Sequence, residues 1–196
     1  MLDRLLHRVL RNAQQDPIPM IVLVPGRLDQ ALVRQALDAV PSTVWAFRFE
    51  EPRENVNWHV WHDWHDMPFP LRDGTILVFS ATDYPVEGVA GGAAGSRCSV
   101  GVFGTETDEV LGLRCWHELL HTLPGVETSD GMLDSGAFRA YLAENYPQMY
   151  DAFVREPERF RHDPRPQRLF YTMLTNAFAA GTGRRLLPLP PAPVLD

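Results

Sequence analysis

Two periods of hydrophobic and polar residues alternate along the first half of the chain. Segments 2–14 and 27–40 place apolar residues three and four positions apart, which is the spacing of an amphipathic helix. The apolar runs at 17–26 and 74–81 predict buried strands, and the alternation at 42–50 predicts a further strand. Helices interspersed with strands predict an α+β fold with a mixed, twisted β-sheet and helices packed on it.

A glycine-rich link at 86–95 precedes another predicted strand at 96–104. The link is too short for a crossover helix, so it predicts a hairpin or an edge strand followed by a loop. Thr105 or Thr107 can then cap a helix whose first turn carries acidic residues. This helix is expected to end at 123–125, where the sequence is Leu-Pro-Gly.

Beyond residue 125 the pattern becomes helical and then proline-rich. Helical periodicity covers 135–146, 147–154 and 166–180. We expect one domain, 1–196, with a cleft between its two parts. The first part, 1–125, holds the sheet and a central helix; the second, 126–185, is smaller and helical, and 186–196 forms an extended tail.

Charge and cysteine content narrow the classes of function. The formal net charge of −7 makes the chain a poor candidate for binding nucleic acid, which depends on cations that neutralise phosphates. Two cysteines do not make a disulfide framework. The first residues have no apolar core of a signal peptide, and no apolar run approaches a membrane span, so we expect no membrane partner and a cytoplasmic protein.

The five residues HELLH, from His117 to His121, lie within the predicted central helix. Residues four apart on an α-helix lie one turn apart on the same face, so both imidazoles can bind one metal ion. Glu118 follows about 100° around the axis, which places its carboxylate beside that ion. Zinc makes a bound water acidic, and a nearby carboxylate can take the proton as the water attacks a carbonyl. The motif therefore predicts a Zn²⁺ site with Glu118 as the catalytic residue.

At these residues the chain resembles the zincin metallopeptidases, most closely the metzincin-like branch that includes the archaemetzincin and snapalysin types. The order of strands and helices before the motif is similar to theirs, and the resemblance covers roughly residues 18–130. It implies a zincin-like fold, an edge strand within 86–104 that holds a peptide or protein substrate, and hydrolysis of peptide bonds. Glu118 would act as general base and then as general acid. The resemblance thus implies a zinc metallopeptidase, a hydrolase.

The third zinc ligand is left open between four acidic residues. In the resembled branch a His or Asp six residues after the second histidine completes the site, and that position is Glu127 here. The helix-ending glycine comes one position later than in that branch, and an insertion in the turn would promote Asp130. Asp130 ranks first because its side chain is short and Gly131 follows it. Glu144, at the position that the gluzincin branch would use, and Asp134 rank lower.

Three Trp-His pairs lie in the segment 58–66. Their period of three fits neither a strand nor an α-helix, so we interpret the segment as a surface loop or irregular strand, with a cleft wall or a second metal site as alternatives. His162 and four tyrosines are expected to be packing residues, although one of them could stabilise an oxyanion: Tyr141, Tyr146, Tyr150 and Tyr171. Cys98 and Cys115 are expected to be small buried thiols.

A second function remains open on the sequence. A non-catalytic zinc-binding or interaction protein could keep the HELLH helix for stability alone. The presence of Glu118 argues against it, because a structural zinc site does not need that carboxylate.

Overall fold

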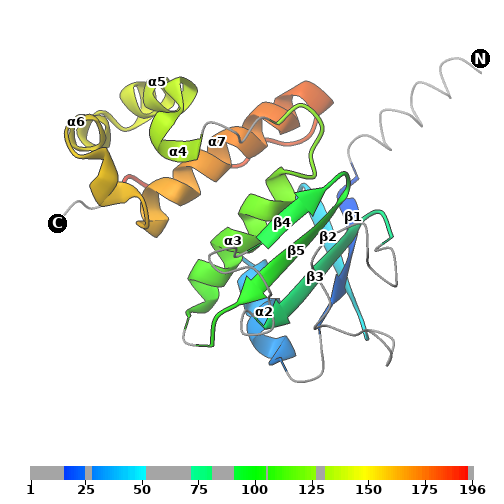
Figure 1. The fold of residues 1–196 in the computed structure, drawn as a ribbon. Coiled ribbons are helices and arrows are strands. Elements are labelled where there is room, and N and C mark those ends of the chain that lie inside the picture. Colours follow the sequence, from blue (N-terminus) through cyan, green and yellow to red (C-terminus); the bar gives the residue numbers. More distant parts are fainter. Residues whose placement is uncertain are drawn as a thin grey trace, which may run out of the picture.

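The described strands form one mixed five-stranded sheet with the order β2-β1-β3-β5-β4 (Figure 1). The computed structural model describes residues 16–24, 28–51, 72–80, 91–104, 106–126 and 131–193. The strands are β1 (Ile18–Leu23), β2 (Trp45–Glu50), β3 (Thr75–Ser80), β4 (Gly91–Ala94) and β5 (Arg97–Val102). The predicted strands are therefore confirmed, and part of the glycine-rich link is the edge strand β4.

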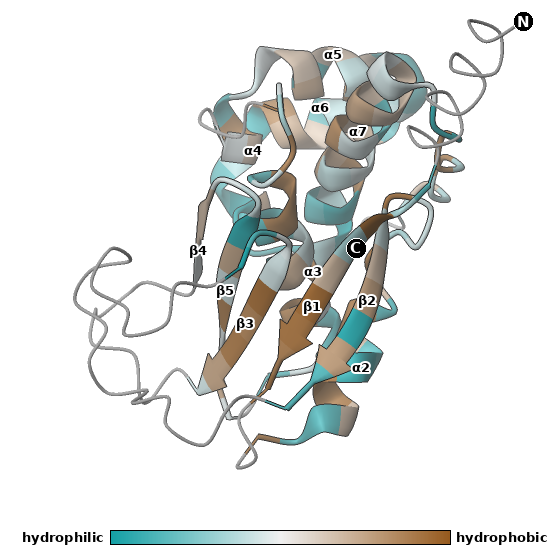
Figure 2. Ribbon diagram, turned by 90° about the vertical axis from the view of Figure 1, so that its right-hand side faces the viewer, coloured by the Kyte–Doolittle hydropathy of each residue, from teal (hydrophilic) through white to brown (hydrophobic). Residues whose placement is uncertain are grey.

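Strand direction separates the edge strand from the others. β1 pairs in parallel with β2 and β3, and β3 pairs in parallel with β5. β4 alone runs antiparallel, with Gly91 opposite Val100 and Ala94 opposite Arg97. Figure 2 shows that β1 and β3 are strongly hydrophobic, in accord with their central place. β4 closes the order on one side, so its outer edge is not paired with any strand of the described part of the chain.

Helices α2 (Gln30–Leu37) and α3 (Asp108–Leu120) pack side by side against the sheet (Figure 2). The side chain of Asp29 accepts a hydrogen bond from the Ala31 N–H and caps α2. Thr107 caps α3 in the same way, by accepting from the Val110 N–H, which decides between the two predicted caps. A methyl group on Gly112 would lie 2.5 Å from the Ala36 carbonyl oxygen, so the two helices meet at backbone distance.

The chain after α3 is helical, as predicted. It comprises α4 (Gly131–Asp134), α5 (Gly136–Asn145), α6 (Pro147–Arg155), the 3₁₀ helix η2 (Pro157–Phe160) and α7 (Pro164–Thr182). Aromatic rings fill the space between these helices; Phe138, for example, meets Phe153 and Phe170 edge to face. α7 packs along α3, where the buried Trp116 Nε1 donates a hydrogen bond to Thr175 Oγ1. The helical part is therefore joined to the sheet-bearing part through α3 (Figure 1).

Residues 184–193 carry no helix or strand and follow the surface of α7 and α5, in accord with the predicted extended tail. Asn176 holds Leu187 by two hydrogen bonds, accepting from its N–H and donating to its carbonyl oxygen. The Tyr146 hydroxyl donates to the Pro190 carbonyl oxygen. Within the described ranges, none of the helices has the length and apolar character to cross a membrane. The predicted helix 2–14 and the Trp-His segment 58–66 lie outside the described residues.

Candidate metal centre

The HELLH motif lies at the C-terminal end of α3, as its chemistry requires. His117 and Glu118 are in the last helical turn, and His121 is the residue that caps it. The helix ends at Leu120, three residues before the predicted end, and a turn leads to Gly125 with φ of +76°. His121 nevertheless keeps helical backbone angles and its N–H donates to the His117 carbonyl oxygen. The two histidines therefore keep the relation of neighbours on one helix face.

The two imidazoles converge on one point. Their Nε2 atoms lie 3.1 Å apart and their rings meet edge to face at 80°. Two ligands of a tetrahedral zinc ion with bonds of about 2.05 Å are separated by about 3.3 Å, so the pair fits this metal. Burial, and then the neighbouring His121, lowers the pKa of His117 to about 4. Burial also lowers the pKa of His121, so both rings are in the neutral form that binds metal.

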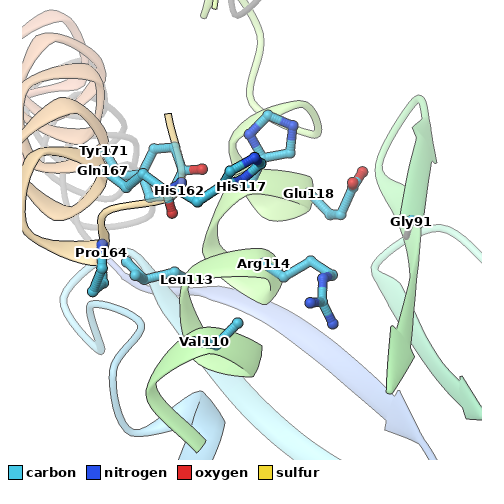
Figure 3. Close-up of a pocket in the computed structure, with 10 residues that line it drawn as sticks. All are labelled: Gly91, Val110, Leu113, Arg114, His117, Glu118, His162, Pro164, Gln167 and Tyr171. Atoms are coloured by element: carbon cyan, nitrogen blue, oxygen red, sulfur yellow. The ribbon is translucent and has the colours of Figure 1, made fainter. Parts of the chain in front are cut away.

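The Glu118 carboxylate points away from the histidines and toward the edge strand (Figure 3). A methyl group on Gly91 of β4 would lie 2.7 Å from Glu118 Oε1, so the carboxylate rests against the strand backbone. Glu118 is only 7% exposed, and burial raises its pKa to about 7, against the opposing influence of Arg114. At neutral pH this carboxyl group can therefore both accept and release a proton.

Arg114 fastens α3 to the end of β5. Its Nη1 donates to the Gly101 carbonyl oxygen at 2.7 Å, and its Nη2 pairs with Glu106 Oε2 at 2.7 Å. Both side chains of the ion pair are largely buried. The Glu106 carboxylate also accepts a hydrogen bond from the Phe103 N–H. This network fixes α3 relative to the β4–β5 hairpin.

A pocket of about 540 Å³ opens beside these groups. One wall is a stripe on α3, and the other comes from the start of α7 and the turn before it (Figure 3). Its lining comprises Gly91, Val110, Leu113, Arg114, His117, Glu118, His162, Pro164, Gln167 and Tyr171. His117 and Tyr171 meet across the pocket with their ring centres 5.7 Å apart. The pocket therefore reaches from the two motif residues His117 and Glu118 into the space between two helices.

The lining contains residues that the sequence predicts and residues that it does not. His162 and Tyr171, two of the possible oxyanion partners, both line the pocket. Gly91, Arg114, Pro164 and Gln167 are not predicted from the sequence. The one available signal is the spacing of 110, 113, 114 and 117, which is that of a single helix face. The other three tyrosines are not among the lining residues.

The described residues do not bring together a full set of metal ligands. No group of three or more His, Cys, Asp or Glu side chains that could hold a metal occurs within them. The two highest-ranked candidates, Asp130 and Glu127, lie outside the described residues. Asp134 and Glu144 are exposed, on α4 and α5. The third ligand therefore remains a prediction.

The cysteines are buried free thiols, as predicted. Burial raises the pKa of Cys115 to about 12 and that of Cys98 well above its usual range. Both are therefore protonated and unreactive at neutral pH.

Comparison with protein-family models, with curated proteins and with solved structures gives no match.

Proposed function

We propose that the chain is a zinc-dependent metallopeptidase of the zincin type, with the metzincin-like branch as its nearest resemblance. The observation that carries the proposal is the arrangement at the end of α3. Two imidazole Nε2 atoms lie 3.1 Å apart, and the residue after the first histidine, Glu118, directs a buried carboxylate to an edge strand. Because a purely structural metal site has no use for such a carboxylate, the arrangement favours hydrolysis.

The roles of the residues follow from this arrangement. His117 and His121 would hold zinc, which when bound supplies a Lewis acid and an acidified water. Glu118 takes the proton of the attacking water and later delivers it to the amine nitrogen of the leaving group, so it ends the cycle in its starting form. Arg114 holds the helix that carries all three groups.

The outer edge of β4, which no strand of the described residues pairs with, is the proposed site for the substrate backbone. An extended peptide can add to an unpaired strand edge through main-chain hydrogen bonds. β4 lies at the end of the sheet order and contacts α3, so a peptide bound there would pass Glu118. The pocket between α3 and α7 is large enough to take a side chain of the same peptide. The substrate would thus be a peptide or protein.

The third ligand is proposed to come from the segment 127–130. Gly125 with φ of +76° and Gly131 with φ of +61° flank this segment, and it follows directly on the turn that ends α3. It is thus the first acidic stretch after His121. Asp130 remains the first choice and Glu127 the second, with Glu144 and Asp134 ranked lower.

The test compares the wild type with Glu118→Gln on a panel of unstructured proteins and peptides. The proposal expects both proteins to retain zinc and only the wild type to cleave. Cleavage by Glu118→Gln at the wild-type rate would rule out the role of the carboxylate. Retained zinc with no cleavage by either protein would favour the alternative, a non-catalytic zinc-binding protein.

A further inference from the structure

Gly91 occupies a position in β4 where no side chain fits. A Cβ atom built on it would lie 2.7 Å from Glu118 Oε1 and 2.8 Å from the Ser99 carbonyl oxygen. Real Cβ atoms essentially never approach other atoms within 3.0 Å. Gly91 does not have a positive φ, so other residues could adopt its backbone conformation. What the position requires is the absence of a side chain.

The two elements that meet at Gly91, strand β4 and helix α3, are each held in place by a further contact. β4 is fixed by its pairing with β5, where Gly91 lies opposite Val100. α3, which carries Glu118, is fixed to the end of β5 by the hydrogen bond from Arg114 to the Gly101 carbonyl oxygen. These contacts hold the strand and the helix close together, and the Glu118 carboxylate lies between them. Of the atoms around Gly91, the carboxylate is the one that can rotate away.

We propose that Gly91 is a positioning residue for Glu118. The Glu118 carboxylate packs against the backbone of β4 at Gly91. The strand proposed to bind the substrate therefore also positions the carboxylate proposed to transfer the proton. This inference rests on the proposed function, because it assigns Glu118 its role there. A side chain at position 91 pushes the carboxylate off the strand and into the open pocket, while His117 and His121 keep their places.

The first experiment does not depend on catalysis. Gly91→Ala is made in the wild type and in the Glu118→Ala background, and thermal unfolding is measured for all four proteins. We expect a fall in Tm in both backgrounds, because the contact with the Ser99 carbonyl oxygen remains in both, and a fall larger by at least about 2 °C where the carboxylate is present. The matched control is Gly104→Ala, because Gly104 is not among the glycines with positive φ and a Cβ added to it would meet nothing within 4 Å.

Comparison of the four proteins tests whether a side chain at position 91 would contact the Glu118 carboxylate. Equal falls in Tm in both backgrounds would mean that Gly91 accommodates only the Ser99 carbonyl oxygen, and would overturn the inference. A fall of similar size in the Gly104→Ala control would show a general sensitivity of the hairpin and would overturn it as well.

The second experiment measures peptide cleavage and bound zinc. Gly91→Ala is expected to lower kcat about tenfold or more with zinc content unchanged. Any change in KM should be smaller than the change in kcat, because the position also lies in the strand and pocket proposed for the substrate. In the Glu118→Asp background, whose carboxylate is one methylene shorter, Gly91→Ala should lower kcat by less than about threefold. A loss of zinc, a loss confined to KM, or equal losses of kcat in the two backgrounds would overturn the positioning role. A wild type that cleaves nothing would instead overturn the proposed function, and the unfolding cycle would still decide the contact.

Discussion

The indole nitrogen of Trp116 donates a hydrogen bond of 3.0 Å to the Thr175 hydroxyl, and this buried contact joins α3 to α7. Thr175→Val keeps the shape of the side chain but leaves the indole N–H without its partner. We expect a loss of about 1–3 kcal/mol in the free energy of unfolding, because a buried donor is left unsatisfied. Urea denaturation measures this loss. Thr175→Ser, which keeps the hydroxyl, is the control, and an equally large loss in that variant would contradict the role of the hydrogen bond.

Purified protein should contain about one zinc ion per chain, as a site built on a histidine pair requires. His117→Ala and His121→Ala should each remove the metal, because either change leaves one imidazole at a site built for two. Elemental analysis of the dialysed proteins measures the content. A wild type that holds no zinc and takes none up would contradict the proposed metal centre.

Substitution identifies the third ligand. We expect Asp130→Ala to weaken zinc retention by at least about tenfold and Glu127→Ala to have a milder effect. Asp134→Ala and Glu144→Ala are the comparison variants, since both side chains are exposed on helices. Competition with a chelator gives the relative affinities. A loss confined to Glu144→Ala would instead place the chain with the gluzincin branch.

Breaking the Arg114–Glu106 pair should cost more than breaking an exposed pair, because its side chains are only 17% and 7% exposed and a charge left alone there stays buried. Arg114→Met leaves the Glu106 carboxylate buried without its cation, and we expect a loss of about 2–4 kcal/mol in the free energy of unfolding. The exposed pair Arg161–Glu158 is the control, and Arg161→Met should have a much smaller effect because water screens this pair. Similar losses in chemical denaturation for the two variants would show that burial does not distinguish the pairs.

Local patterns in the sequence predicted much of the fold and the helix that carries the HELLH motif. The apolar run around Ile76 and Val78 has no exposed face and is a central strand. The helix around His117 was predictable because its cap, periodicity and motif all agree. These features depend on residues that are close together in the chain, so their spacing is visible in one dimension.

Contacts between distant residues could not be predicted in this way. The second wall of the pocket depends on α7 packing on α3, which brings Tyr171 to His117 across more than fifty positions. The importance of Gly91 depends on a carboxylate 27 positions later, and no periodicity reports such a contact. The helix also ends at Leu120 instead of near Pro124, because the turn residues before the proline already leave the helical hydrogen-bond pattern.

The close approach of Gly112 to Ala36 bears on how this protein can evolve or be engineered. Gly112 lies on the side of α3 opposite to Arg114, His117 and Glu118, since residues two, five and six positions later point roughly the other way. If the proposed function holds, substitutions on the pocket side would change substrate preference without disturbing the packing of α3 on α2. A substitution at Gly112 would move both imidazoles and the carboxylate together. A mutant library aimed at the pocket should vary Val110 and Gln167 and leave Gly112 and the buried Leu113 unchanged.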